Sequence, residues 1–393
     1  MNKILNVGIL GTDISTKNKL SSLSKSEQVN VFFLDLSNSN IYEKSIDVIL
    51  TTNEWLYKWR IAIYEFKKRK IPCFYLIDGV LDWDYIWNNW SYIKPNGSFV
   101  QPLLSDMIGV VGKNQLRLLT MFNIKKPMCL IGMPRLDTCE IFKAKSTQNI
   151  ILVCTANTYA LNISAEVKVK QALKDLKCFF EENDVVDVIW RIDERLAKSL
   201  DILNNHDKDL NNVLRKAKAV ITFPSTVALE SMLNNIPTCI IDYRNVPRLI
   251  KSAWQISNKH EITKTVHELI FPSAEKLLFQ QFCIDDQLTQ DSTNRLIHCL
   301  YELCGINNDS LDVIDVENQK HPIISFNQLN NHLSTFLLDD DKEVQYYLDA
   351  YSNECKHLRG VIDYILHALK NDFRNKDGKF VIKELLNHLN NIL

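Results

Sequence analysis

The sequence lacks an excess of charge of either sign and a long apolar run. Its 393 residues include 46 Lys and Arg against 47 Asp and Glu, a balance that gives no electrostatic reason to expect nucleic acid as the main partner. No run of about 18 apolar residues is present, so no membrane span is predicted. The opening MNKILNVGILGTD turns polar too soon for a signal peptide. We therefore expect a cytoplasmic protein.

The sequence also lacks paired cysteines. Ten cysteines are scattered singly and none forms a CxxC pair. Four of them, Cys73, Cys129, Cys154 and Cys239, lie inside apolar runs that are typical of strands. This distribution favours buried thiols over a disulfide framework or a zinc site.

Several catalytic signatures are absent. The sequence contains no GxSxG, Walker A or kinase motif, and all nine histidines lie at or beyond position 206. His260 and His267 are seven residues apart, which is not the HExxH spacing of a zinc protease. These absences weaken hydrolase, NTPase and kinase readings.

What the sequence does contain is an alternation of strand-like and helix-like segments. Hydrophobic residues make up 46% and charged residues 24%, which is typical of a globular protein. Strands that alternate with helices predict a parallel sheet covered on both faces, an α/β fold. The expected strands are Ile4–Leu10, Val29–Leu34, Ile46–Leu50, Cys73–Ile77, Met107–Val111, Met128–Ile131, Ile150–Cys154, Val185–Ile192, Ala219–Phe223 and Thr238–Ile241.

The alternation restarts after the polar stretch Gly132–Gln148, which predicts two Rossmann-like domains in tandem. We expect these domains to cover residues 1–145 and 146–306. Residues 307–393 then form a connector and a mainly helical C-terminal extension. Apolar residues from Leu358 to Leu369 recur at helical spacing. That helix either packs on the body of the protein or contacts a membrane surface from the cytoplasmic side.

The segment from Ala219 to Tyr243 carries the strongest functional signal. Its pattern predicts a buried strand, a turn with Ser225 as helix N-cap, a helix opened by Thr226, and a second strand. Hydroxyls at a helix N-terminus beside the carboxyl end of a strand predict an anion site. Glu230 shares a helix face with Thr226 and is placed to accept bonds from ribose or sugar hydroxyls. The alternative is that Ser225 only caps the helix and Glu230 only complements its dipole.

Other polar residues follow strands of the second half. Thr155 and Asn157 form a small hydroxylated loop that suits a donor phosphate, or a plain turn. Arg191 is a candidate for binding phosphate or a sugar carboxylate. Asp193 is a candidate base or nucleophile. Its alternative role is to cap the following helix.

In the first half, Asp78 ends a strand and precedes a glycine, so it is placed to face a cleft. Trp83 and Trp87 belong to an aromatic cluster that forms either a sugar-stacking wall or core. Gly11 follows the first strand and is a minor acceptor-side candidate, with a simple tight turn as the alternative. Asp82-Trp83-Asp84 spells the D-x-D of metal-dependent GT-A glycosyltransferases. The two-domain pattern argues against that fold, so no metal site is predicted.

Several segments together resemble a known superfamily. PSTVALE, followed by a proline and a strand that ends in Asp-Tyr, is similar to the nucleotide-sugar site of GT-B glycosyltransferases and UDP-sugar 2-epimerases. IGMPRLD is similar to the GxPRxD of epimerases and polyol-phosphate polymerases of this type. DGVLDW and DYRNVP resemble bacterial surface-carbohydrate proteins related to retaining β-Kdo transferases. The resemblance spans roughly residues 70 to 300.

The resemblance implies a metal-independent GT-B glycosyltransferase without a cofactor, acting in surface polysaccharide (lipopolysaccharide or capsule) assembly. It implies a nucleotide-sugar donor, with CMP-Kdo as one candidate, and a glycan or lipid-linked acceptor. An aspartate nucleophile maps onto Asp193 or Asp78. The alternatives are a nucleotide-sugar 2-epimerase and a non-catalytic sugar-nucleotide binding protein. The candidate donor-binding residues are Ser225, Thr226, Glu230, Arg191, Thr155 and Asn157, and the acceptor-side residues are Gly11, Trp83 and Trp87.

Overall fold

The structure is a computed structural model. It describes residues 4–87, 103–121, 124, 126–137, 149–156, 159–160, 162–183, 186–205, 207 and 209–306. The expected C-terminal connector and amphipathic helix lie outside these residues, as does Asn157. Both sheets of the protein lie within one compact unit of the chain, Met1–Leu337.

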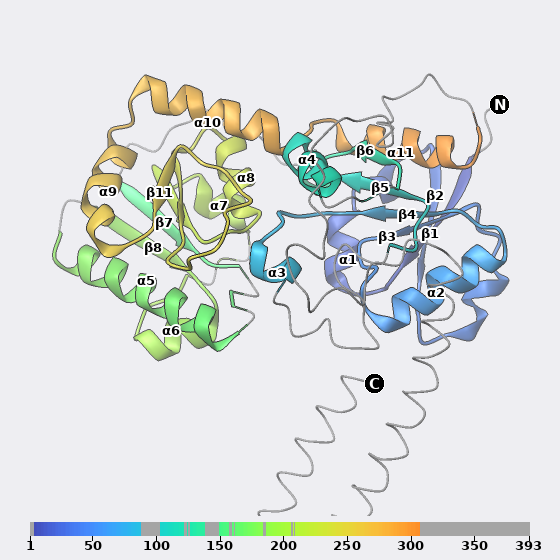
Figure 1. Ribbon diagram of the computed structural model, residues 1–393, viewed down its shortest axis with the longest axis horizontal. Coiled ribbons are helices and arrows are strands. Elements are labelled where there is room, and N and C mark those ends of the chain that lie inside the picture. The colour runs from blue at the N-terminus through green and yellow to red at the C-terminus, as the bar shows by residue number, and fades with distance from the viewer. Residues whose placement is uncertain are drawn as a thin grey trace, which may run out of the picture. The chain divides into compact units, whose positions relative to one another are not determined.

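The first sheet has six parallel strands in the order β2-β1-β3-β4-β5-β6. Figure 1 shows it with helices on its faces. Its strands are β1 (Leu5–Leu10), β2 (Val29–Leu34), β3 (Val48–Thr51), β4 (Cys73–Leu76), β5 (Met107–Val110) and β6 (Met128–Leu130). The helices that connect them are α1 (Ile14–Lys19), α2 (Tyr57–Lys68), α3 (Trp83–Trp87) and α4 (Lys113–Met121), with short 3₁₀ turns η1 (Leu23–Lys25), η2 (Ser39–Glu43) and η4 (Pro134–Leu136).

The second sheet has five parallel strands in the order β11-β10-β9-β7-β8. Its strands are β7 (Ile150–Cys154), β8 (Asp187–Arg191), β9 (Ala219–Thr222), β10 (Thr238–Ile241) and β11 (Trp254–Ile256). Its helices are α5 (Ile163–Glu181), α6 (Glu194–Leu200), α7 (Leu210–Leu214), α8 (Val227–Leu233) and α9 (Ile262–Ile270), with the 3₁₀ turn η5 (Lys259–Glu261). The predicted two-sheet α/β architecture is therefore confirmed.

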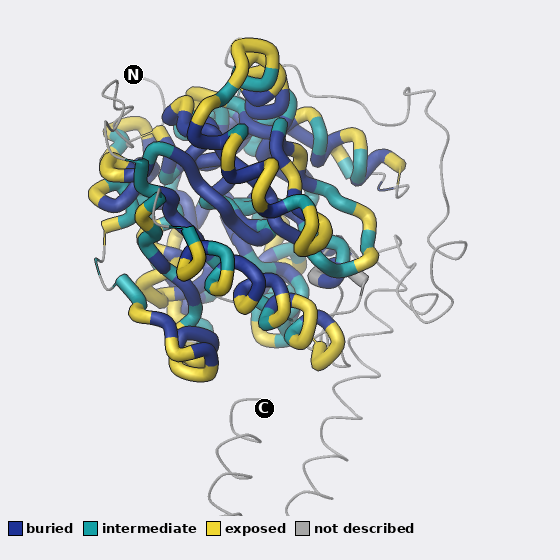
Figure 2. The backbone as a smooth tube through the Cα atoms, turned by 90° about the vertical axis from the view of Figure 1, so that its left-hand side faces the viewer, coloured by how far each residue is buried: buried dark blue, intermediate teal, exposed yellow. Residues whose placement is uncertain are grey.

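The central strands are buried on both faces. Every residue of β3, β4, β5, β9 and β10 is buried, and Figure 2 shows buried backbone at the centre of the fold with exposed residues on the outer helix faces. Parallel strands in such a position read as continuous apolar runs, which explains why the sequence located them within one or two residues. Cys73, Cys129, Cys154 and Cys239 are buried free thiols, as predicted, whereas Cys178 is exposed.

The chain crosses from the second sheet back to the first through α10 (Ala274–Gln287) and α11 (Ser292–Leu303). α10 packs against both α8 and α4, and Figure 1 shows α11 along the six-stranded sheet. Leu296, Ile297 and Leu300 of α11 are buried in the same core cluster as β1 and β3. The predicted domain bounds placed this helix in the second domain, but its apolar face packs in the core of the first. The predicted junction near residue 145 lies outside the described residues.

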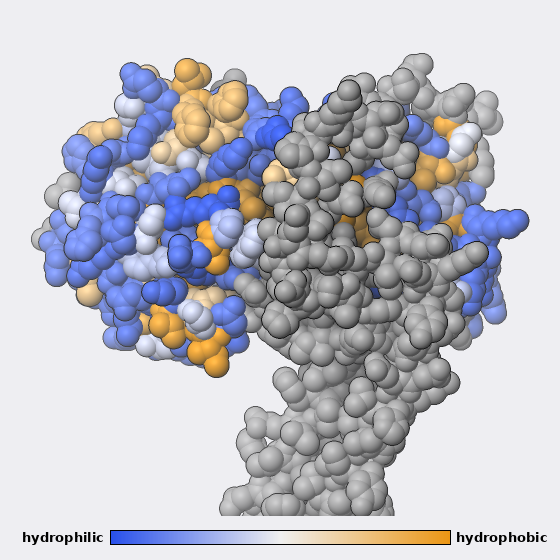
Figure 3. Space-filling view, in the orientation of Figure 1, coloured by the Kyte–Doolittle hydropathy of each residue, from blue (hydrophilic) through white to orange (hydrophobic). Residues whose placement is uncertain are grey.

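One face of α10 is apolar and exposed. Leu278 is 74% exposed and Phe282, one turn further along the helix, is 70% exposed, and the neighbouring Phe279 is 53% exposed. Figure 3 shows hydrophobic side chains gathered in this region amid hydrophilic surface. No helix in the described ranges is long and apolar enough to cross a bilayer.

Candidate functional site

The segments that follow the strands of the two sheets lie against each other. Gly79, just after β4, is so close to Thr226, just after β9, that a Cβ atom on the glycine would lie 3.4 Å from the threonine Cγ2. In the second sheet, β7 and β9 are the neighbours from which the strand order runs in opposite directions. Ligands of open α/β sheets bind outside the carboxyl ends of the strands at such a switch point. The candidate site is therefore the region where the ends of β7 and β9 face the end of β4.

The turn before α8 differs in detail from the prediction. The helix begins at Val227, with Thr226 rather than Ser225 at the N-cap position, and Thr226 makes no side-chain capping bond within the described part of the chain. Ser225 is buried, and its Oγ lies 3.1 Å from Oγ1 of Thr222. Ser225 is thus not the cap, because its hydroxyl turns toward the end of β9 instead of the helix amides.

Glu230 is a buried carboxylate with an arginine partner. Its side chain is 10% exposed, and its Oε1 lies 2.7 Å from Nη2 of Arg135. Arg135 belongs to η4, in the segment after β6. A carboxylate out of water needs such a compensating charge and hydrogen bond. Glu230 therefore lies one helical turn behind Thr226, with its orientation fixed by an arginine from the first domain.

Asp193 occupies the N-cap position of α6, which was the structural alternative for this residue. Its Oδ1 accepts the Arg195 N–H at 2.9 Å, and the Arg195 guanidinium pairs with the same carboxylate. Burial acts to raise the pKa of Asp193, but the bonds from Arg195 outweigh it and hold that pKa below its usual value. The carboxylate is therefore an anion at neutral pH, as a nucleophile or a base must be.

Asp193 and Thr155 are joined across the ends of β8 and β7. The Asp193 N–H donates to Thr155 Oγ1 at 2.9 Å, so the two strand-end loops form one surface. Arg191 donates from Nη1 to the carbonyl of Asp207. That bond orients its side chain along the loop before α7.

On the first domain, Asp78 forms an ion pair with Lys19, whose Nζ lies 2.9 Å from Oδ2. The two residues come from the ends of β4 and α1, and both side chains are partly exposed. Gly11 adopts a φ of +112° and donates its N–H to Leu34 O at 3.0 Å. This is the tight-turn geometry that favours glycine.

The two tryptophan candidates lie on α3. Trp83 is half-buried and packs against a core cluster that contains Leu81 and Ile86. Its contacts match the core alternative that the sequence left open. Trp87 is the last residue of α3, and its side chain is outside what the structure describes.

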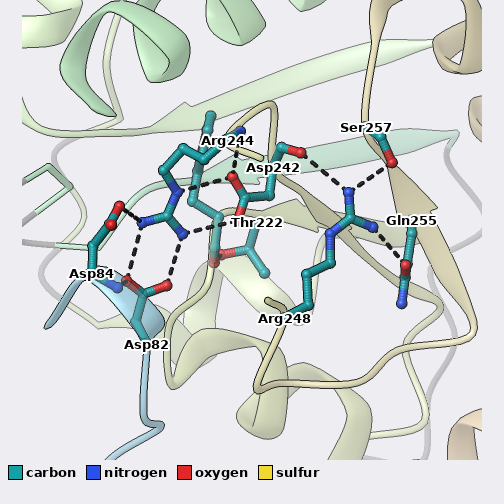
Figure 4. A network of polar contacts seen from close by, with 9 residues as sticks. Asp82, Asp84, Thr222, Asp242, Arg244, Arg248, Gln255 and Ser257 are labelled. Atoms are coloured by element: carbon teal, nitrogen blue, oxygen red, sulfur yellow. Dashed lines mark hydrogen bonds and ion pairs between the residues drawn. The ribbon is translucent and has the colours of Figure 1, made fainter. Parts of the chain in front are cut away.

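A set of four charged residues, here called the Arg244 clasp, joins the domains beside this site (Figure 4). It consists of Asp82, Asp84, Asp242 and Arg244. The guanidinium donates to Asp242 from Nε at 2.9 Å and from Nη2 at 2.8 Å. It also donates to Asp82 at 2.7 and 3.0 Å and to Asp84 at 2.8 Å. The D-x-D residues thus bind an arginine of the other domain.

Burial acts to lower the pKa of Arg244, but the hydrogen bonds with Asp242 and Asp82 outweigh it and raise that pKa. Sequence reasoning assigned no role to Arg244, Arg135 or Lys19. Two signals were available: Arg135 and Arg244 each come within five residues of a strand's carboxyl end, and they lie in the IGMPRLD and DYRNVP segments that carry the resemblance.

The sequence matches no protein-family model, and it matches no curated protein. Its fold is similar to solved structures. S. aureus MnaA in a co-structure with UDP superimposes with a TM-score of 0.56 at 13% identity, over 79% of this chain and 100% of that one. UDP-GlcNAc 2-epimerase from Neisseria meningitidis bound to UDP-GlcNAc gives 0.54 at 11% identity, over 76% and 99%. The wall teichoic acid polymerase TagF with CDPG gives 0.50 at 10% identity, over 77% and 89%. The chain therefore has the two-domain GT-B fold.

Proposed function

We propose that this protein is a GT-B enzyme that transfers a sugar from a nucleotide-sugar donor to a glycan or lipid-linked acceptor in surface polysaccharide synthesis. The observation that carries the proposal is the buried, arginine-paired carboxylate of Glu230, one turn behind Thr226 and beside the end of β9. A buried anion at that point suits the ribose hydroxyls of a nucleotide, because each hydroxyl can donate a charge-assisted hydrogen bond to it.

In this proposal the donor lies on the second domain. Its phosphates take the turn at Ser225 and Thr226 and the small loop at Thr155. Backbone amides at the start of α8 and the Arg191 guanidinium supply the compensating positive charge. Asn157, two residues after Thr155 in the sequence, is the remaining donor-binding candidate.

The acceptor enters from the first domain, past Gly11, Asp78 and the α3 tryptophans Trp83 and Trp87. In this proposal Asp78, whose carboxylate pairs with Lys19, acts as the base that removes the acceptor proton. Asp193 is the candidate nucleophile toward the anomeric carbon. Helix termini and basic side chains stabilise the departing phosphate, so the mechanism requires no metal ion.

A second candidate function is nucleotide-sugar 2-epimerisation. The specific observation in its favour is the fold similarity to the N. meningitidis UDP-GlcNAc 2-epimerase, whose TM-score of 0.54 exceeds the 0.50 of TagF. Fold similarity at this identity does not choose between the two chemistries.

The deciding experiment incubates the purified protein with a panel of nucleotide sugars, with CMP-Kdo as one member, and follows the products by NMR. Each donor is tested with and without a candidate glycan acceptor. Free nucleotide together with a glycosylated acceptor supports the transferase. An isomerised nucleotide sugar supports the epimerase, and binding in calorimetry without any product identifies a binding protein.

A further inference from the structure

The segment from Asp78 to Ile86 is held from both domains. On its own side, Gln115 Nε2 donates to the Gly79 carbonyl at 2.6 Å, and Leu81 and Ile86 are buried in the core. Asp82 also accepts the Asp84 N–H at 3.1 Å at the start of α3. These contacts fix the ends of the segment, and the carboxylates of Asp82 and Asp84 lie between them.

A positive charge that pairs with both carboxylates comes from the second domain. Asp84 and Asp242 are almost fully buried, at 5% and 3% side-chain exposure, and Arg244 at 10% lies between them. Three carboxylates this close repel one another, and burial adds to the cost of their charge. The observed conformation of Asp82 and Asp84 therefore depends on Arg244.

The bonds of Arg244 fall into two groups, one within the second domain and one that joins the two domains. Arg244 and Asp242 are two residues apart on one loop, so their pairing survives any movement of one domain against the other. The bonds to Asp82 and Asp84 span about 160 residues of sequence and join the domains. Separation of the domains would break these bonds and remove the Arg244 guanidinium from both Asp82 and Asp84.

We propose that Arg244 is a positioning residue that acts from the second domain to set the conformation of residues 78–86, which carry Asp78 and Trp83. The assignment of these residues to the acceptor side rests on the proposed function. The acceptor side of the site is then complete when the clasp is formed, and Arg244 acts without contacting the donor. Arg248 offers a matched comparison, because it bonds Gln255, Ser257 and the Asp242 carbonyl, all in the second domain (Figure 4).

Hydrogen exchange followed by mass spectrometry tests this placement directly. In Arg244→Gln, amides in peptides covering residues 79–86 should exchange at least about tenfold faster than in the parent, because local opening becomes easier. The double variant Asp82→Ala/Asp84→Ala, which removes the acceptors of the guanidinium on this segment, should show the same increase, because the bonds that join the domains are lost. Arg248→Gln should exchange like the parent. Unchanged exchange in both the Arg244 and the double variant, or an equal increase in Arg248→Gln, overturns the proposal.

Binding and turnover separate this inference from the proposed function. With the donor found in the panel, Arg244→Gln should keep nucleotide affinity within about threefold and lose at least about tenfold in turnover, since only positioning is disturbed. A large loss of nucleotide affinity with unchanged turnover contradicts a positioning role. If the parent binds no nucleotide, the proposed function fails while the exchange experiment still decides whether Arg244 holds the segment. Circular dichroism confirms folding, and the double variant replaces Arg244→Gln if the latter unfolds.

Discussion

Arg135 and Glu230 form an ion pair that ties the segment after β6 to the helix α8 of the other domain, with 2.7 Å between Nη2 and Oε1. The pair places a buried carboxylate at the end of β9 and fixes which way it points. A ligand hydroxyl that bound to Glu230 would therefore share that carboxylate with Arg135 of the first domain.

The donor-site prediction follows from this pair. Glu230→Ala and Ser225→Ala should each weaken nucleotide binding by about 1.5–3 kcal/mol, the value of a charge-assisted hydrogen bond. Calorimetry with the donor identified in the panel measures the change. Glu275→Ala, which removes an exposed carboxylate on α10, should leave affinity unchanged. Parental affinity in both site variants would exclude this location for the donor.

The catalytic prediction concerns Asp193 and Asp78. In a double displacement, one carboxylate oxygen bonds to the anomeric carbon while the bond from that carbon to the phosphate oxygen breaks, and the nucleotide leaves with the electron pair. We expect the resulting sugar ester on Asp193, detectable by mass spectrometry of the parent after incubation with donor. Asp193→Asn should abolish the adduct but keep the fold, because asparagine caps helices as well as aspartate does.

An adduct mapped to Asp78 would reverse the assignment. An inverted product with no adduct on either residue would remove the double displacement altogether. If the Asp→Asn variants of both positions keep near-parental turnover, these aspartates serve the structure and the chemistry lies elsewhere.

Activity should survive metal removal. Asp82 and Asp84 both bind the Arg244 guanidinium, and no group of three or more potential metal-ligating acidic, His or Cys side chains occurs in the part of the chain that the structure describes. Turnover measured in excess EDTA should therefore equal turnover without it. Complete loss in EDTA, restored by Mn²⁺, would instead assign the D-x-D a metal-binding role.

Glu54 should make stability depend on pH. It is fully buried, accepts the Leu104 and Ser105 N–H groups and the Ser105 hydroxyl, and burial raises its pKa despite these bonds. A carboxyl whose pKa is higher in the folded than in the unfolded state contributes its stability fully below the unfolded value of about 4.3 and loses it as pH rises through the folded value. Chemical denaturation of Glu54→Gln should accordingly show a flatter pH dependence above pH 4 than the parent.

Glu54→Ala should behave differently, because it leaves two buried N–H groups without an acceptor. Each unsatisfied group costs about 1–3 kcal/mol. Equal pH profiles for the parent and Glu54→Gln would show that this carboxyl does not titrate differently on folding.

The close packing of the α10–α11 connection against Gly132 should require a glycine at that position. Its φ is +95°, and a Cβ atom there would lie 2.1 Å from Thr289 O and 2.4 Å from Ser292 Oγ. Gly132→Ala should therefore destabilise the protein by about 1–3 kcal/mol from overpacking, in addition to backbone strain. Gly305→Ala is the matched control, since that residue has a φ of +70° with no atom of the described residues within 4 Å of the added Cβ. Equal unfolding free energies for the two variants would show that the contact with Thr289 contributes nothing.

The sequence by itself determined most of the strands and the class of fold. β7 and β10 were located with their observed limits, because a strand buried on both faces must be apolar throughout. The short strand β11 was missed, since its three residues include the exposed Gln255 and its identity as a strand comes from pairing with β10. The sequence also placed Glu230 and Thr226 on one helix face, which follows from local geometry.

Contacts between residues that are far apart in the sequence were determined only by the tertiary structure. The sequence pattern shows that α11 has an apolar face. It does not show that this face packs on the first sheet, because that depends on the chain returning from the second domain to the first. The partners of charged side chains were likewise set by the tertiary structure. Asp82 and Asp84 spell a D-x-D, which the sequence left without a metal assignment because the two-domain pattern argued against the GT-A fold. Only the tertiary structure shows that both carboxylates bind Arg244 of the other domain. The residue types in a short motif indicate which chemistry they can perform. The fold determines which oppositely charged side chain comes within hydrogen-bond distance of them.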